Sequence, residues 1–244
     1  MSISGWGNYP VIDARVTTPA TEAVAAGAVS DGFKGIARGL GRSYGDSSLA
    51  PEAMSMLAMD HMLSFDDTSG VLVCEAGVSL ADILDVFVPR GWFLPVTPGT
   101  RFVTVGGAIS SDVHGKNHHH DGCFSQHLEW FDLVLADGTT RQVSRLTEPE
   151  LFAATCGGMG LTGIITRAAM RLAPVNSAYI DETTIKARSL DELLELYDAH
   201  ESSKYSVAWI DCLSTGKQSG RSLLSLGDHA TDGNLSIPAQ RQLS

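Results

Sequence analysis

The chain has 244 residues, of which 43% are hydrophobic and 18% charged. It can therefore build a sizeable core, and its composition excludes an intrinsically disordered protein. Its 28 acidic and 17 basic residues give a net charge of −11, and no run rich in Lys or Arg occurs. This excludes a general surface for nucleic acid or anionic membranes, although one local basic contact to an anionic ligand stays open.

The four cysteines are scattered without a CxxC pair, at Cys74, Cys123, Cys156 and Cys212. This spacing favours reduced thiols in a cytoplasmic protein over a disulfide framework or a zinc site. The N-terminal stretch lacks the basic and apolar regions of a signal peptide, and no segment reaches the roughly 18 apolar residues of a membrane span. We expect a soluble protein, for which peripheral membrane contact stays open.

The first half of the chain predicts short strands and helices between glycine-rich loops. Apolar and β-branched residues favour strands at 11–16, 35–38, 56–59 and 71–75. A helix over 18–28 is expected from Thr18 followed by Pro19, and another over 79–88 from a capping box of Ser79 and Asp82. The segment TVGGAISSD at 104–112 predicts a third helix, after which the loop HGKNHHHDG follows.

The second half of the chain predicts a hairpin, a helix and a strand, and then a second group of elements after Pro174. Strands at 128–135 and 140–143 flank the turn Asp137-Gly138, and a helix at 149–155 precedes a glycine loop and a strand at 163–172. Pro174 marks a domain boundary. Beyond it we expect a strand at 178–186, a helix at 190–199 capped by Ser189 and Glu192, a strand at 205–213, and a polar tail over 215–244 without periodicity. About 70 residues with such a tail are hard to stabilise alone, so an incomplete second domain is expected.

The first segment that could carry chemistry is RGLGRSYGD at residues 38–46. Its glycines can adopt positive φ and turn backbone N–H groups into one concavity that suits a pyrophosphate, with Arg38 or Arg42 adding a charge-assisted bond. The spacing G-x-G-x-x-x-G is one residue longer than the dinucleotide fingerprint, and no helical pattern follows, which disfavours a nicotinamide site. A plain glycine turn between two strands is the structural alternative.

The second segment is PGTRFVTVGGAISSD, beginning at Pro98. It predicts a turn and then a helix whose first residues lack bulk, and such a helix start can receive an anion. Two glycine-rich segments of this type in one chain favour a diphosphate that spans both loops.

The third segment is HGKNHHH at residues 114–120. Adjacent residues of an extended chain point to opposite sides, and no motif such as HExxH is present, so we expect no metal site. His119 and His120 suit a solvated polar loop. His114 and Lys116, directly after the predicted helix, suit a place beside the cofactor. A fourth segment, CGGMGLTGII from Cys156, indicates close backbone approach to a flat ligand or to another loop.

Taken in this order and spacing, these segments resemble the FAD-binding domain of the vanillyl-alcohol-oxidase superfamily, and within it the family of the oxidase component of decaprenylphosphoryl-ribose 2-epimerase. The resemblance covers about residues 10–213. It implies an α+β fold: a two-subdomain FAD-binding domain of the PCMH type over residues 1–174, followed by the start of an α+β substrate domain, incomplete, over residues 175–244.

The resemblance also implies which residues contact the flavin cofactor. Superfamily members often carry a covalent flavin on a histidine of the first loop. That loop reads Arg42-Ser43-Tyr44 here, so the resemblance implies non-covalent FAD. The implied cofactor-binding residues are Arg38, Gly39, Leu40, Gly41, Arg42, Ser43, Tyr44, Pro98, Gly99, Thr100, Val105, Gly106, Gly107, Ser111, His114, Gly115, Asn117, Gly158, Gly163 and Ile164.

The activity implied is oxidation of a secondary alcohol of a sugar or polyprenyl-phospho-sugar by hydride transfer to flavin N5, with His114 and Lys116 as the candidate catalytic residues. The implied partners are a sugar or lipid-linked sugar substrate and an NAD(P)H-dependent reductase. Two alternatives stay open. One is an alditol or aldonolactone oxidase, and the other is a flavin-binding fragment without turnover.

Overall fold

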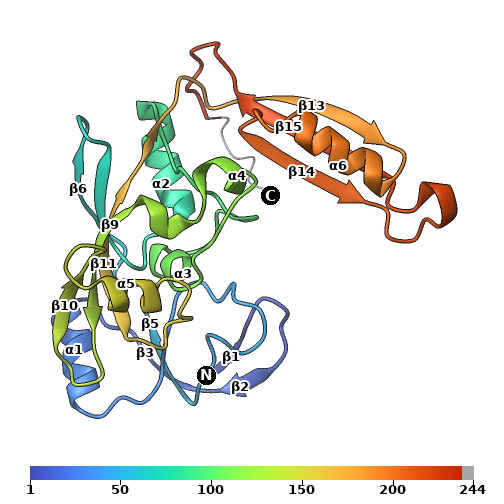
Figure 1. The fold of residues 1–244 in the computed structure, drawn as a ribbon. Coiled ribbons are helices and arrows are strands. Elements are labelled where there is room, and N and C mark those ends of the chain that lie inside the picture. The colour runs from blue at the N-terminus through green and yellow to red at the C-terminus, as the bar shows by residue number, and fades with distance from the viewer. Residues whose placement is uncertain (238–244) are drawn as a thin grey trace, which may run out of the picture.

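The computed structural model describes residues 1–237, which form two units of different size. The larger unit contains two main sheets and most of the helices, whereas the smaller unit is a three-stranded sheet with one helix. Figure 1 shows the smaller unit, in orange and red, projecting from one side of the larger one. The mixture of helices and sheets agrees with the predicted α+β class. Within the described residues, none of the helices has the length and apolar character needed to cross a membrane.

The first sheet of the larger unit is parallel and has the strand order β3-β5-β4. A helix, α1, lies in the crossover connection from β3 to β4, the two outer strands that each pair with β5. The carboxyl ends of β4 and β5 therefore lie side by side, at the edge where open parallel sheets commonly bind ligands. These elements are β3 (Arg15–Thr17), α1 (Glu22–Ser30), β4 (Ile36–Arg38) and β5 (Glu52–Ser55).

The second sheet is antiparallel, with the order β10-β9-β11-β7-β6. Its central strands are buried on both faces. Phe131 and Met170 face a core shared with α2, α3 and α5, whereas Val134 and Ile164 pack against α1 and β5. The elements are β6 (Met62–Asp66), β7 (Val71–Glu75), α2 (Leu80–Phe87), α3 (Val105–Ser110), β9 (Leu128–Val134), β10 (Thr140–Val143), α5 (Pro149–Thr155) and β11 (Ile164–Arg171).

Short elements complete the larger unit. An N-terminal hairpin pairs β1 with β2, and a two-residue ladder pairs β8 with β12. Short helical turns form the end of the histidine-rich segment (residues 114–121), follow that segment, and follow α2. The elements are β1 (Ser2–Ser4), β2 (Val11–Asp13), η1 (Val88–Arg90), β8 (Trp92–Phe93), α4 (His118–Asp121), η2 (Phe124–His127) and β12 (Ala173–Pro174).

The smaller unit is an antiparallel sheet of order β13-β15-β14 with α6 on one face. Leu193 of α6 packs against Leu224 and Leu226 of β15. The opposite face carries Trp209, which is 71% exposed, and Leu223. The elements are β13 (Ile180–Ala187), α6 (Leu190–Ala199), β14 (Tyr205–Ile210), η3 (Gly216–Gln218) and β15 (Ser222–His229).

The predicted structureless tail is wrong over residues 222–229, which form β15, the central strand of the smaller sheet. Ladders to β13 and β14 hold the strand on its two sides, so its conformation depends on partners outside its own local sequence. Leu224 and Leu226 are the apolar residues of β15 that pack against α6, and this short alternation is easily missed among Ser, Gly, Asp and His. Residues 238–244 of the predicted tail lie outside the described residues.

Other boundaries also differ from the sequence expectations. Helix α1 begins at Glu22 rather than near Thr18, because Thr21 caps it by accepting a hydrogen bond from the Val24 N–H. The strand expected at 56–59 is wrong: β5 ends at Ser55, and a turn follows in which the Met59 N–H donates to the Met56 carbonyl.

The helix caps differ in how fully they form. The capping box of Ser79 and Asp82 is confirmed. For α6, Ser189 accepts from the Glu192 N–H, but the Glu192 carboxylate accepts from the Arg188 N–H instead of closing the box.

Candidate functional site

A cavity of about 760 Å³ lies between the two main sheets of the larger unit. The volume is within the range of small-molecule and cofactor sites, about 300–1,000 Å³. The cavity is bordered by the loop after β4, by the segment that leads into α3, and by the segment that leads into β11. Its lining residues are Trp6, Ala37, Arg38, Gly39, Leu40, Gly41, Arg42, Ser43, Tyr44, Ser47, Ser48, Met56, Ala76, Pro98, Gly99, Thr100, Val103, Thr104, Gly106, Gly107, Ser110, Ser111, Val113, Met159, Gly160, Gly163 and Ile165.

The charge of this lining is opposite to that of the chain. Two arginines and no carboxylate line the cavity among the described residues, although the protein as a whole carries a net charge of −11. Local positive charge in an enclosed, partly apolar site favours an anionic ligand. The sequence left room for one such local contact, and the cavity offers a place for it.

The loop from Gly39 to Tyr44 has backbone N–H groups available for a ligand. Within residues 1–237, none of these six amides donates a hydrogen bond to the protein, although the loop lines the cavity. Backbone polar groups at such a place need a partner from ligand or solvent. A loop of successive unpaired amides in a concave surface is a typical cradle for phosphate oxygens.

Two glycines of this loop are required, one by close packing and one by its backbone conformation. A Cβ on Gly39 would lie 2.2 Å from Oγ1 of Thr104, the N-cap of α3, so only glycine lets the two predicted segments touch. Gly41 has a φ of +67°, and a Cβ there would meet the Arg38 guanidinium. Such positive φ is accessible to glycine without the usual steric cost.

The start of α3 contributes to the cavity in a different way. The amides of Val105 and Gly106 donate to the carbonyls of Val78 and Ala76, each at 2.8 Å, and the Gly107 amide donates to Thr104 Oγ1 at 3.2 Å. All three therefore have partners within the protein. Gly107 is exposed to the cavity, and a Cβ there would have only Thr104 Oγ1 within 4 Å. This helix start therefore offers a small surface that a ligand can approach closely.

The two arginines of the lining have unequal freedom. Arg38 donates through Nη1 to the Ser48 hydroxyl at 2.9 Å and through Nη2 to the Ser4 carbonyl at 2.6 Å, and burial lowers its pKa. Its guanidinium thus ties the loop to the N-terminal hairpin. Arg42 forms no ion pair with a described carboxylate and lies over the ring of Trp6. Arg42 is the arginine that remains available to an anion.

The segment from His114 to Asp121 leads from the cavity to the smaller unit. Val113 lines the cavity. The exposed His114 follows it, and its ring contacts that of His118 edge-on, at 5.3 Å between centroids. The predicted loop is partly helical, because residues 118–121 form α4.

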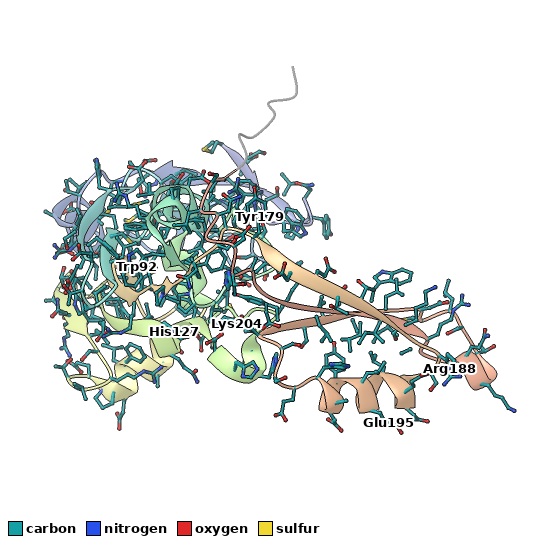
Figure 2. All side chains as sticks on the ribbon, turned by 90° about the horizontal axis from the view of Figure 1, so that it is seen from above. Trp92, His127, Tyr179, Arg188, Glu195 and Lys204 are labelled. Carbon is teal, nitrogen blue, oxygen red and sulfur yellow. The ribbon has the colours of Figure 1, made fainter. Side chains whose placement is uncertain are left out.

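Contacts with β14 and the turn before it hold this segment in place. The Ser206 N–H donates to the Lys116 carbonyl at 2.9 Å, and Lys204 Nζ lies 2.9 Å from Asp121 Oδ2. Figure 2 shows Lys204 where the two units meet and Arg188 at the far end of the smaller unit. His119, expected on a solvated loop, is within hydrogen-bond distance of the Ser203 carbonyl at 3.0 Å. The histidine-rich segment is therefore a junction between the units as well as an edge of the site.

Asn117 is fully buried in this junction. Its Nδ2 donates to the Pro95 carbonyl and to Asp121, whereas its Oδ1 has no hydrogen-bond partner among the described residues. Burial would raise the pKa of Asp121, but hydrogen bonds from Lys204 and Asn117 lower it below its ordinary value. Gly115 is required here, since a Cβ would lie 2.5 Å from the Thr97 carbonyl.

The fourth segment, CGGMGLTGII, reaches the cavity only partly through the residues that were predicted for it. Met159 and Gly160 line the cavity together with Gly163. Gly158 packs on the end of α5, where a Cβ would lie 2.2 Å from the Ala154 carbonyl. The side chain of Ile164 is buried in the core beside Met54, which leaves its backbone for any contact with a ligand.

The cavity therefore brings together most of the predicted cofactor residues, and a few stand apart from it. Val105 is buried in the core, and His114, Gly115, Lys116 and Asn117 follow the cavity edge. Sequence reasoning missed several lining residues, among them Trp6 and the Ser47-Ser48 pair. The serines extend the glycine loop and could have been included with it, whereas Trp6 lies in a segment without a local signal.

The histidine and cysteine side chains form neither of the alternative sites considered from the sequence. All four cysteines are unpaired, and burial raises the pKa of Cys74 and of Cys156 to about 12. Over residues 1–237, no group of three or more His, Cys, Asp or Glu side chains is placed to hold a metal ion.

Comparison with known proteins agrees with the geometry of the site. The family described as "FAD binding domain" matches residues 16–144. Decaprenylphosphoryl-beta-D-ribose oxidase of Mycolicibacterium smegmatis is 39% identical over 238 residues, which cover 93% of this chain and 52% of that protein. The chain thus spans about half the length of this relative.

Two more distant relatives match smaller parts of the chain. L-gulonolactone oxidase of Bos taurus is 28% identical over 142 residues, which cover 58% of this chain and 31% of that protein. Delta(24)-sterol reductase of Rattus norvegicus is 26% identical over 158 residues, which cover 65% of this chain and 30% of that protein. The family match covers more than half of the chain and agrees with a cavity that offers unpaired amides and an unpaired arginine to a diphosphate. The chain belongs to the FAD-binding-domain family of FAD-linked oxidoreductases, and the predicted FAD cofactor is confirmed.

Proposed function

We propose that the chain is the FAD-binding part of an oxidoreductase that oxidises a secondary alcohol of a sugar or polyprenyl-phospho-sugar. The observation that carries the proposal is the cavity between the two sheets, with its unpaired amides, its two arginines and its lack of carboxylates. The similarity to decaprenylphosphoryl-beta-D-ribose oxidase of Mycolicibacterium smegmatis supports a lipid-linked sugar as the substrate class.

The residues of the cavity fit FAD. The amides of residues 39–44 and the guanidinium of Arg42 would hold the diphosphate, and Gly107 would let it pass close to α3. When bound, FAD supplies the hydride acceptor at flavin N5. The protein's own part is to hold the cofactor, to orient the alcohol and to remove the hydroxyl proton.

His114 is the residue proposed to take that proton. It directly follows Val113 at the cavity edge, is exposed, and has no hydrogen-bond partner for its ring nitrogens among the described residues. Histidine exchanges protons readily near neutral pH. Lys116 is proposed to assist from the same stretch, whose backbone is held in place by Ser206.

The test uses the full-length protein and anaerobic reduction of the bound flavin by a polyprenyl-phospho-sugar, followed at the flavin absorption band. We expect His114→Ala to keep FAD and to slow this reduction by about 100-fold. His120→Ala is the matched control, because His120 is an exposed histidine of the same segment without the contact that His119 makes to Ser203. Reduction of the His114→Ala protein at the wild-type rate would remove His114 from the mechanism.

We further propose that the flavin is bound non-covalently, because the first loop, Arg42-Ser43-Tyr44, carries no histidine. Acid precipitation is then expected to release all the yellow colour into the supernatant. Flavin that stays with the precipitated protein would contradict this proposal.

Residues 175–244 are proposed to begin a substrate domain. The open face of the smaller sheet supports this, because Trp209 and Leu223 form part of an apolar surface of the kind that usually receives another element or a ligand. A partner reductase dependent on NAD(P)H belongs to the same proposal, as does a cytoplasmic location, which rests on the four unpaired cysteines.

An alditol or aldonolactone oxidase is the second candidate, and the relative named L-gulonolactone oxidase favours it. Flavin reduction by an alditol or an aldonolactone, with rapid reoxidation by oxygen, would support this candidate. FAD binding without reduction by any of these substrates would support a flavin-binding fragment without turnover.

A further inference from the structure

The N-terminal hairpin forms part of the wall of the FAD cavity. Residues 1–15 precede the segment that matches the family, yet Trp6 is among the lining residues. The side chain of Trp6 is 54% exposed, so core packing does not account for it. A large aromatic residue at the edge of a cofactor cavity points to a role toward the ligand or toward the residues that hold it.

The hairpin contacts the glycine loop at successive residues. The Ser4 carbonyl accepts from Arg38, and the Trp6 N–H donates to the Ser43 carbonyl at 2.9 Å. Gly5 fits between two carbonyls of the loop, since a Cβ there would lie 2.7 Å from the carbonyl oxygens of both Ser43 and Gly45. These contacts hold the backbone that carries the unpaired amides.

The contact at Ser43 also sets the direction of an amide. The C=O of Ser43 and the N–H of Tyr44 belong to one planar trans peptide group and point in opposite directions. Because the carbonyl faces Trp6, the Tyr44 N–H is turned away from the hairpin. The hairpin thereby keeps a donor of the lining free for a ligand.

Trp6 also contacts the guanidinium of Arg42, whose central carbon lies 5.5 Å from the ring centroid. Arg38, the other arginine of the lining, is occupied by Ser4 and Ser48. An aromatic face attracts a guanidinium without neutralising its charge, so it can hold Arg42 in place and leave its N–H groups for an anion.

We propose that Trp6 is a positioning residue for FAD, which holds the Arg42 guanidinium at the wall of the cavity where the diphosphate binds. The proposal rests on the FAD cofactor and is independent of the substrate and of the role of His114.

The experiment measures the dissociation constant of FAD from the apoprotein by fluorescence titration. Trp6→Leu is expected to raise the constant about fivefold, the size of an exposed cation–π contact, and Trp6→Phe to restore most of the affinity. In the Arg42→Gln background, Trp6→Leu is expected to change it by less than about twofold, because coupled residues are non-additive. Tyr9→Ala is the control, since Tyr9 is an exposed aromatic of the same hairpin that does not line the cavity.

A series of tryptophans with one, two and three ring fluorines, placed at position 6 alone, tests the same contact without changing its shape. Each fluorine withdraws charge from the ring face, so the dissociation constant is expected to rise step by step. A flat series would overturn the proposal, even if Trp6→Leu fails to fold. Equal effects of Trp6→Leu with and without Arg42 would also overturn it.

Discussion

Two glycine-rich segments meet at the cavity, and they serve it by different means. In the loop from Gly39 to Tyr44 the backbone amides have no partner within the described residues, whereas the first amides of α3 donate to Val78, Ala76 and Thr104. The loop is irregular and can present donors, while the amides of the helix start are already satisfied by the Thr104 side chain and by carbonyls of the segment that follows β7. Glycine in the loop thus serves hydrogen bonding, and glycine in the helix serves close approach.

The strongest test of this comparison is Gly107→Val. We expect the loss of FAD binding, because a branched side chain at this exposed position would fill the space beside α3. The apoprotein is expected to unfold at nearly the wild-type temperature, because only Thr104 Oγ1 lies near the new Cβ, at 3.2 Å. FAD content after purification and thermal unfolding of the apoprotein measure the two effects.

Cys123→Ser is the control for Gly107→Val, since Cys123 is unpaired and does not line the cavity. It is expected to keep full FAD occupancy. Equal occupancy in the wild-type and Gly107→Val proteins would break the assignment of α3 as a surface for close approach.

Gly39→Ala is expected to affect folding as well as binding. The new Cβ would lie 2.2 Å from Thr104 Oγ1, so the loop and the helix start must move apart. We expect a loss of about 1–3 kcal/mol in the free energy of unfolding, the usual cost of overpacking, together with weaker FAD binding. Denaturant unfolding of the apoprotein measures the first effect. Gly7→Ala, with no atom within 4 Å of the new Cβ, should leave both quantities unchanged.

The smallest effect is expected for Thr104→Val, which removes the hydroxyl that accepts from the Gly107 N–H. Loss of an N-cap costs about 1 kcal/mol in the free energy of unfolding. FAD affinity should change little, because the proposed donors to the diphosphate are the backbone amides of residues 39–44 and not those of α3. Thr104→Ser keeps the cap and should behave as wild type. A large change in FAD affinity with unchanged stability would place a donor on α3 and reverse the comparison.

Features with a complete local signal were predicted well. The capping box of Ser79 and Asp82 forms, and the turn at Asp137-Gly138 joins β9 to β10, with Gly138 at a φ of +79°. In both, the residues that decide the conformation are neighbours in sequence, so the pattern contains its own partners. Strand β15 was missed for the opposite reason, because its ladders join it to β13 and β14.

The sequence by itself determined the family, the FAD cofactor and most of the residues that line the cavity. The reason is that the positions and spacing of glycines show where a loop needs positive φ or close approach. Only the tertiary structure decided which amides remain unpaired, which of the two arginines is available, and that Trp6 and the histidine-rich segment border the site. Whether a hydrogen-bond donor is free for a ligand depends on which acceptors the fold brings close to it from distant parts of the chain. The sequence alone therefore does not show which donors are free.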